Sequence, residues 1–120
     1  MQHAAQAYGK VARQTSSPRE MEASLLLKAA ARLQAVSDNW GDRAVIDEAL
    51  LYNRKLWSIF LTSVMRAENP LPEQVRQNVA NLGVFVMNQT VSLMTEPRRE
   101  KLAPLININR ELAAGLLGRG

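Results

Sequence analysis

Apolar residues recur every three or four positions along most of the chain, the spacing of one face of an α-helix. The first clear segment opens at Ser17-Pro18-Arg19-Glu20, where Ser is a good N-cap, Pro suits the first helical position and Glu can close a capping box. We expect this helix to end near Asp38. Its predicted buried row is Met21, Leu25, Ala29, Leu33 and Val36, and its predicted polar row is Ser24, Lys28 and Arg32.

A second helix is predicted from Asp42, which can cap it, to about Ala67. Its apolar row is Ile46, Leu50, Leu56 or Trp57, Phe60 and Val64, and its one polar member is Asn53. The prolines of Glu68-Asn-Pro-Leu-Pro-Glu73 end this helix and begin the next.

The third helix, about Pro72 to Met94, has no charged residue between Gln77 and Thr95. That stretch is long enough to cross a bilayer, but its side-chain amides and hydroxyls would lose their water there, so we reject a membrane span. It is either the central helix of a bundle or a helix whose outer face meets a partner. Gly83 within it favours a close helix approach or a kink.

A last helix is expected after Pro97, with a kink or division at Pro104 near Ala103 and an apolar row of Leu105, Ile108, Leu112 and Leu116. A short N-terminal helix, about Gln2 to Arg13, is also predicted, although it holds Gly9. No strand pattern or repeat stands out. The fold prediction is therefore all-α: an antiparallel bundle of four main helices plus a short N-terminal helix, forming a single domain over residues 1–120.

Composition adds limits to this picture. The chain has 120 residues, an apolar fraction of 47% and no cysteine, so it has room for one modest core and no disulfide or thiolate chemistry. The N-terminus lacks the apolar run of a signal peptide, which favours a cytoplasmic protein. Net charge is +4, but each half carries a similar excess, eight Lys or Arg against six acids and then seven against five. A mixed-charge surface is therefore favoured over a nucleic-acid patch.

Residues that could support catalysis are scarce. His3 is the only histidine, and no second histidine or cysteine could complete a metal site or activate a serine. Asp47 and Glu48 are adjacent on a helix and point about 100° apart, so they cannot converge on one substrate atom. We expect no enzyme activity, no cofactor and no metal site.

Binding residues are easier to propose. The first candidates are Tyr52, Asn53, Arg54, Lys55 and Trp57. Asn53 is either a core amide paired with Asn81, Asn88 or Gln89, or a contact to another protein, because a buried amide needs a partner. Trp57 is either core or an interface anchor near the rim.

The second candidate surface lies on the uncharged helix. It consists of Asn81, Phe85, Asn88 and Gln89, beside Leu82 and Val86. Amides at helical spacing can match a partner helix or a helix of the same chain, so both possibilities stay open.

Four segments carry a resemblance to a known family. They are Ser17 to Gln34, Glu48-Ala-Leu-Leu-Tyr-Asn-Arg-Lys-Leu-Trp-Ser-Ile-Phe-Leu61, Val75 to Val91, which contains Val-Met-Asn-Gln-Thr-Val, and Leu105 to Leu116. From about Tyr8 to the C-terminus, the chain resembles FlaF, a family of flagellar biosynthesis regulators.

The resemblance implies a role in flagellin synthesis and secretion. Flagellin, through a helical terminal segment, is the partner it implies first, with the protein acting as a chaperone or adaptor. The alternative is a post-transcriptional regulator acting through FlbT or flagellin messenger RNA, although the even charge distribution disfavours direct RNA binding. The oligomeric state stays open between monomer and dimer.

Overall fold

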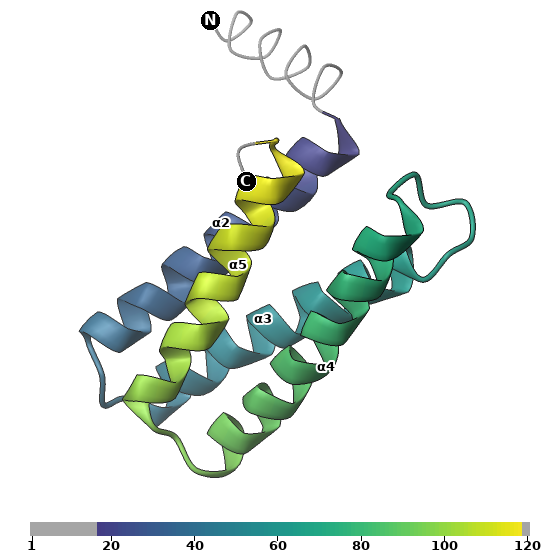
Figure 1. The fold of residues 1–120 in the computed structure, drawn as a ribbon. Coiled ribbons are helices and arrows are strands. Elements are labelled where there is room, and N and C mark those ends of the chain that lie inside the picture. The colour runs from purple at the N-terminus through teal and green to yellow at the C-terminus, as the bar shows by residue number, and fades with distance from the viewer. Residues whose placement is uncertain (1–16, 119–120) are drawn as a thin grey trace, which may run out of the picture.

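The computed structural model describes residues 17–118, and every regular element within that range is helical. It contains α2 (Pro18–Asp38), α3 (Arg43–Val64), α4 (Glu73–Thr95) and α5 (Leu102–Leu116), with a short 3₁₀ helix, η1 (Arg99–Lys101), directly before α5 (Figure 1). The all-α prediction is confirmed for this part of the chain. The helix predicted over Gln2 to Arg13 lies outside the described residues.

Side-chain caps fix where α2 and α3 begin. The Ser17 hydroxyl accepts from the Glu20 backbone N–H at 3.0 Å, and the Glu20 carboxylate accepts from the Ser17 N–H at 2.9 Å. This is the predicted capping box, with Pro18 at the first helical position. Asp42 likewise caps α3 by accepting from the Ala44 N–H at 3.0 Å.

The end of α3 comes earlier than predicted, at Val64 instead of Ala67. The Asn69 amide explains the difference, because it donates to the Ser63 carbonyl at 3.1 Å and accepts from the Leu71 N–H at 2.9 Å. A side chain beyond the helix thus satisfies one of the open carbonyls of its last turn and folds the following residues into a loop.

The last predicted segment is divided near Ala103, as expected, but not by Pro104 itself. Pro104 is the third residue of α5, so it lies in the first turn, where an N–H has no intrahelical partner to lose. The irregularity comes earlier, where η1 passes into α5 at Leu102.

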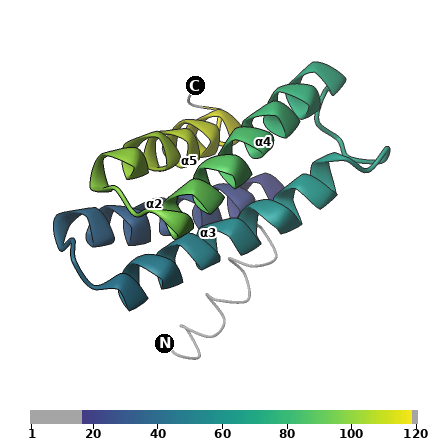
Figure 2. The same cartoon turned by 90° about the horizontal axis from the view of Figure 1, so that it is seen from below.

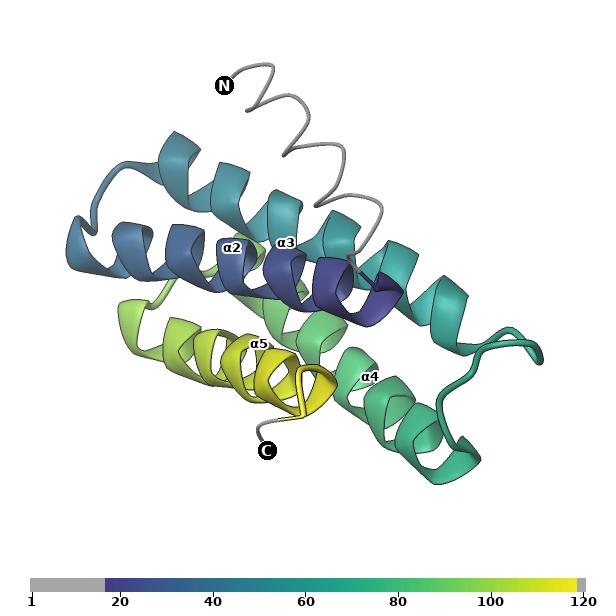
Figure 3. The same ribbon diagram turned by 90° about the horizontal axis from the view of Figure 1, so that it is seen from above.

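The helices share one hydrophobic core, which includes Leu26, Leu33, Leu50, Trp57, Phe60, Val86, Leu93, Leu102 and Leu105. α2 packs against both α3 and α5, and α3 also packs against α4, whereas α4 and α5 make few contacts with each other. Figures 2 and 3 show α2 between α3 and α5, with α4 on the same side of α3 as α5. At the centre, the rings of Trp57 and Phe60 meet edge to face with centroids 5.7 Å apart.

The predicted buried row of α2 was partly wrong. Met21 and Leu25 are 51% and 38% exposed, while Ala23, Leu26 and Ala30 are almost completely buried beside Leu33 and Val36. Small alanine side chains allow a neighbouring helix to come close, and α2 has two neighbours to accommodate. Its contact surface is therefore wider than one row and turned away from Met21.

Gly83 marks the close approach of α3 and α4. A Cβ at this position would lie 2.9 Å from the Leu61 Cγ, too near for an unshifted side chain. The interpretation of Gly83 as a site of close helix approach is confirmed, and Leu61 is the side chain that fills the space. At the other end of this pair, the Arg43 guanidinium donates to the Met94 carbonyl.

Candidate partner-binding surface

A hydrogen-bonded polar layer crosses the core between α3 and α5. The Trp57 Nε1–H donates to the Asn109 Oδ1 at 2.8 Å, and the Asn109 Nδ2 donates to the Asn53 Oδ1 at 2.7 Å. All three side chains have 0% exposure. Among the described residues, the Asn53 Nδ2 finds no hydrogen-bond partner.

This layer decides between the two interpretations of Asn53 and Trp57. Both are core residues and neither offers a surface to a partner, so their placement among the partner-binding residues is corrected. The Asn53 amide pairs with Asn109 on α5, and not with Asn81, Asn88 or Gln89 on α4. The bond from Asn109 satisfies the buried Asn53 oxygen, while the Asn53 Nδ2 has no partner in the described chain.

The remaining candidates on α3 lie around the outside of the helix. Tyr52 is half-buried, and the Arg32 guanidinium carbon lies 4.3 Å from its ring centroid, a cation–π contact between α3 and α2. Arg54 and Lys55 are exposed. The structure therefore does not bring the five α3 candidates together at one surface.

The α4 candidates are more accessible. Phe85 is 43% exposed, Asn81 and Asn88 are exposed, and Gln89 is half-buried. The Asn81 amide oxygen accepts from Gln77 Nε2 at 3.1 Å within the helix, while the Gln89 Nε2 donates to the Lys101 carbonyl at 3.1 Å. One amide of this group thus ties α4 to η1, and two remain at the surface.

The Gln89 bond also shows which side of α4 is turned toward α5. Phe85 and Leu82 precede Gln89 by four and seven residues, so they share its face. Leu82 and Phe85 are nevertheless 36% and 43% exposed. α5 therefore leaves this side of α4 largely open.

α5 contributes the other wall of this open side. Leu105, Ile108 and Leu112 follow Lys101 by four, seven and eleven residues, so they lie on the α5 face turned toward α4. Leu105 is buried, whereas Ile108 and Leu112 are only partly buried. Figure 1 shows α4 and α5 diverging away from the loop that joins them. We call Leu82, Phe85, Gln89, Ile108 and Leu112 the α4/α5 face.

Sequence reasoning found the α4 half of this face and missed its α5 half. The row Leu105, Ile108 and Leu112 was recognised as apolar, but a helical pattern does not say which neighbour it faces. The α5 half could have been predicted from one signal: consecutive helices α4 and α5 each carry an uncharged row, and two such rows can face each other.

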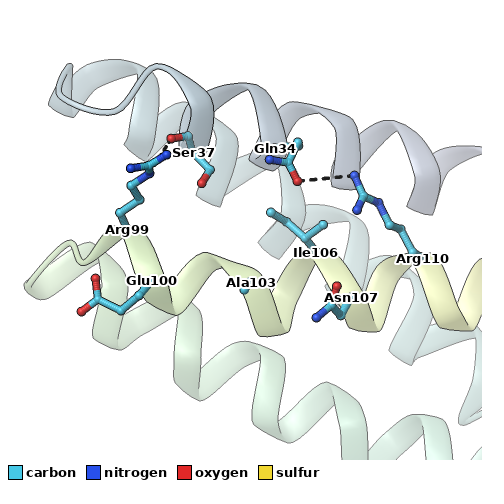
Figure 4. A pocket seen from close by; sticks show the side chains of 8 residues that line it. All are labelled: Gln34, Ser37, Arg99, Glu100, Ala103, Ile106, Asn107 and Arg110. Carbon is cyan, nitrogen blue, oxygen red and sulfur yellow. Dashed lines mark hydrogen bonds between the residues drawn. The ribbon is translucent and has the colours of Figure 1, made fainter.

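A separate hollow of about 480 Å³ lies between α2 and α5. Figure 4 shows Arg99 of η1 and Arg110 of α5 reaching across to α2, on either side of Ala103 and Ile106. The Arg99 Nε donates to the Ser37 carbonyl at 2.8 Å, and the Arg110 Nη2 lies 3.5 Å from the Gln34 Oε1. These contacts tie η1 and α5 to α2. Ser37 and Glu100 both line the hollow, and no hydrogen bond joins these two described side chains.

Burial raises the pKa of the Glu22 carboxyl, and the charge of Arg19 partly counters that rise. No cluster of three or more His, Cys, Asp or Glu side chains within residues 17–118 could hold a metal ion. No helix of the described chain has the length and hydropathy needed to span a membrane.

We compared the chain with models of known protein families. A family model described as "Flagellar protein FlaF" matches residues 4–116. The chain belongs to the FlaF family. The resemblance drawn from the four sequence segments is confirmed, and the protein is a flagellar one. Neither the curated proteins nor the solved structures contain a match to this chain.

The matched range contains all four described α-helices, including both walls of the α4/α5 face. The polar layer and the α4/α5 face therefore both lie within the part of this chain that the family model matches.

Proposed function

We propose that this FlaF-family protein is a non-enzymatic cytoplasmic chaperone or adaptor that binds a helical terminal segment of flagellin. The observation that carries the proposal is the α4/α5 face, where two uncharged rows leave Leu82 and Phe85 exposed. Family membership supports a flagellar role, and flagellin is the partner that the family resemblance implies.

The chemistry of the face suits a helical ligand. An amphipathic helix presents apolar side chains spaced by three or four residues, and these can contact Phe85 of α4 and Ile108 of α5. Gln89 lies at the narrow end of the face and is already committed to the Lys101 carbonyl. Asn81 and Asn88 lie outside the apolar row and supply amides for the rim. Covering the apolar stripe of an unassembled flagellin end would prevent premature polymerisation.

Calorimetric titration with full-length flagellin, and with flagellin lacking its terminal helices, tests this function. Because no member of the α4/α5 face is charged, we expect binding that changes little between two salt concentrations and is lost on truncation of flagellin. Loss of binding at high salt would instead point to an electrostatic contact elsewhere on the protein.

A matched pair of variants tests the surface. Phe85→Asp is expected to weaken flagellin binding about tenfold or more, because a charge replaces an apolar anchor. Val84→Asp is the control, since Val84 is 61% exposed but is turned about 100° away on the same helix. Equal weakening by both variants would contradict the assignment to the α4/α5 face. If flagellin does not bind at all, the same titration with FlbT and then with flagellin messenger RNA tests the regulatory alternative.

A further inference from the structure

The outer side of α4 carries an unbroken row of uncharged residues. Its members are separated alternately by four and three residues, and they are Gln77, Asn81, Val84, Asn88, Val91 and Thr95. All six are exposed, and the exposed fractions of Val84 and Val91 are 61% and 54%. We call this surface the α4 outer row.

The α4 outer row lies opposite the buried side of the helix. Val86 and Leu93 are buried in the core, and each follows a valine of the row by two residues. Because a helix turns about 100° per residue, Val84 and Val91 point about 160° away from these core side chains. The row is therefore turned away from the helices that cover the other side of α4.

Both the composition and the spacing of the row are those of a contact surface. Exposed helix faces usually carry charged residues, whereas no Asp, Glu, Lys or Arg lies between Gln77 and Thr95. Alternating steps of four and three average 3.5 residues, the repeat with which two helices interdigitate over several turns. The row is about 27 Å long, so it fits another helix along its whole length.

We infer that the α4 outer row pairs with the same row of a second copy of this chain, with the two helices antiparallel. The row has no charge that would select an oppositely charged partner. An asparagine amide has both donors and an acceptor, so a surface of valines and asparagines complements an identical one.

The charge at the start of α4 favours the antiparallel direction. Glu73 is exposed and lies four residues before Gln77, so it extends the row at its first turn. Parallel helices would place two Glu73 carboxylates side by side, where like charges repel. Antiparallel helices that cross near residue 86 hold the same carboxylates about 39 Å apart.

The other charges near the two ends of α4 do not oppose this contact. Each Glu73 would lie near the C-terminal end of the other α4, where Glu96 and Arg98 form an ion pair at 3.3 Å. Arg76 is half-buried and donates to the Arg66 carbonyl at 3.1 Å, on the side of α4 turned about 100° away from the row.

The antiparallel arrangement pairs valines with amides. Val84 would pack against Asn88 of the second copy, and Asn81 against Val91 of the second copy. Amides in such a seam reduce affinity, and a contact along one helix falls at the low end of interface sizes, below about 1,200 Å² in total. We therefore expect a dimer that dissociates on dilution.

Sedimentation equilibrium of the full-length protein tests the dimer. Between about 10 μM and 1 mM, the average mass should rise from that of one chain toward that of two. Val84→Asp should keep the mass at one chain, because it places a carboxylate in the seam from both copies. Ile59→Asp is the matched control, since Ile59 is also 61% exposed but lies on α3. Its mass should rise as in the parent protein.

A second variant guards against a folding defect in the first. Asn88→Leu should tighten the dimer about tenfold, because it replaces an amide of the seam by an apolar side chain. A variant that merely unfolds would not gain affinity in this way.

Disulfide cross-linking tests the direction of the two helices, and the absence of native cysteine makes it specific. Oxidation of Asn81→Cys/Val91→Cys should yield a covalent dimer, because these positions meet between copies. Asn81→Cys alone should not be cross-linked, since its two copies would lie about 15 Å apart, too far for a disulfide.

A parent protein that keeps the mass of one chain over this range overturns the dimer. Equal dissociation by Val84→Asp and Ile59→Asp, growth beyond two chains, no gain with Asn88→Leu, or efficient cross-linking of Asn81→Cys alone overturns it as well. Flagellin binding is expected to survive Val84→Asp, so the dimer and the proposed function can fail separately.

Discussion

The two sides of α5 differ sharply although both are lined with apolar residues. Toward α2, the packing is continuous and is closed by the Arg99 and Arg110 contacts. Toward α4, a single hydrogen bond from Gln89 to the Lys101 carbonyl holds the start of the pair, and the helices then separate.

The neighbours explain the difference. α2 meets α5 with small residues, such as Ala23 and Ala30, that are nearly fully buried, whereas α4 offers Leu82 and Phe85, which remain exposed. Small side chains allow helix axes to approach, and large ones on both partners hold them apart. Hydrophobicity thus identifies the helix faces that favour burial. Side-chain size helps decide which of these faces are buried against another helix of the same chain.

The largest expected loss of stability comes from a substitution in the closed, well-packed core. Trp57→Ala should destabilise the protein by about 3–5 kcal/mol, because it removes a fully buried indole and leaves the Asn109 oxygen without its donor. Urea unfolding measures this loss. Trp57→Phe should lose less, since it keeps most of the ring volume. A Trp57→Ala variant of unchanged stability would contradict the core assignment.

The polar layer gives the next effect. Asn109→Ala leaves two buried groups unpaired, the Trp57 Nε1–H and the Asn53 Oδ1, whereas Asn53→Ala leaves only the Asn109 Nδ2. We expect Asn109→Ala to cost about 2–4 kcal/mol, and Asn53→Ala to cost about 1 kcal/mol less. Asn53→Ala also removes an Nδ2 that has no partner in the described chain. Equal losses in chemical denaturation would disprove this ranking.

The smallest expected loss of stability comes from a substitution on the open α4/α5 face. Leu82→Ala should reduce stability by about 1 kcal/mol or less, because Leu82 is 36% exposed and its neighbours can relax into solvent. Leu105→Ala, on the facing row but with 0% exposure, should cost about 2–5 kcal/mol. Comparing the two thermal midpoints sharpens the distinction between the open and closed sides of α5. Similar losses would mean that Leu82 is covered in solution.

Local features of the sequence predicted much of the fold. Ser17 and Glu20 defined the start of α2 because a capping box depends only on neighbouring residues. The α3 row was right for Ile46, Leu50, Phe60 and Val64, with Trp57 as the buried alternative to Leu56. Each of these interactions lies within one helix or one turn.

The errors arose where the answer depends on which helices become neighbours. Met21 and Leu25 were expected in the core because α2 has apolar residues on more than one side, and its periodicity alone cannot rank them. Asn53 was matched with amides of α4, but its partner is Asn109, 56 residues away on α5. The open α4/α5 face was only half recognised for the same reason.

The buried hydrogen bond of Trp57 also fixes the surroundings in which this indole fluoresces. An indole with 0% exposure and a fixed Nε1–H partner on α5 emits from a dry, constant environment. Trp40, the other tryptophan, is only partly buried at the turn after α2. In a Trp40→Phe background, the emission of Trp57 would therefore report whether α5 stays docked on α3 while a ligand occupies the neighbouring face.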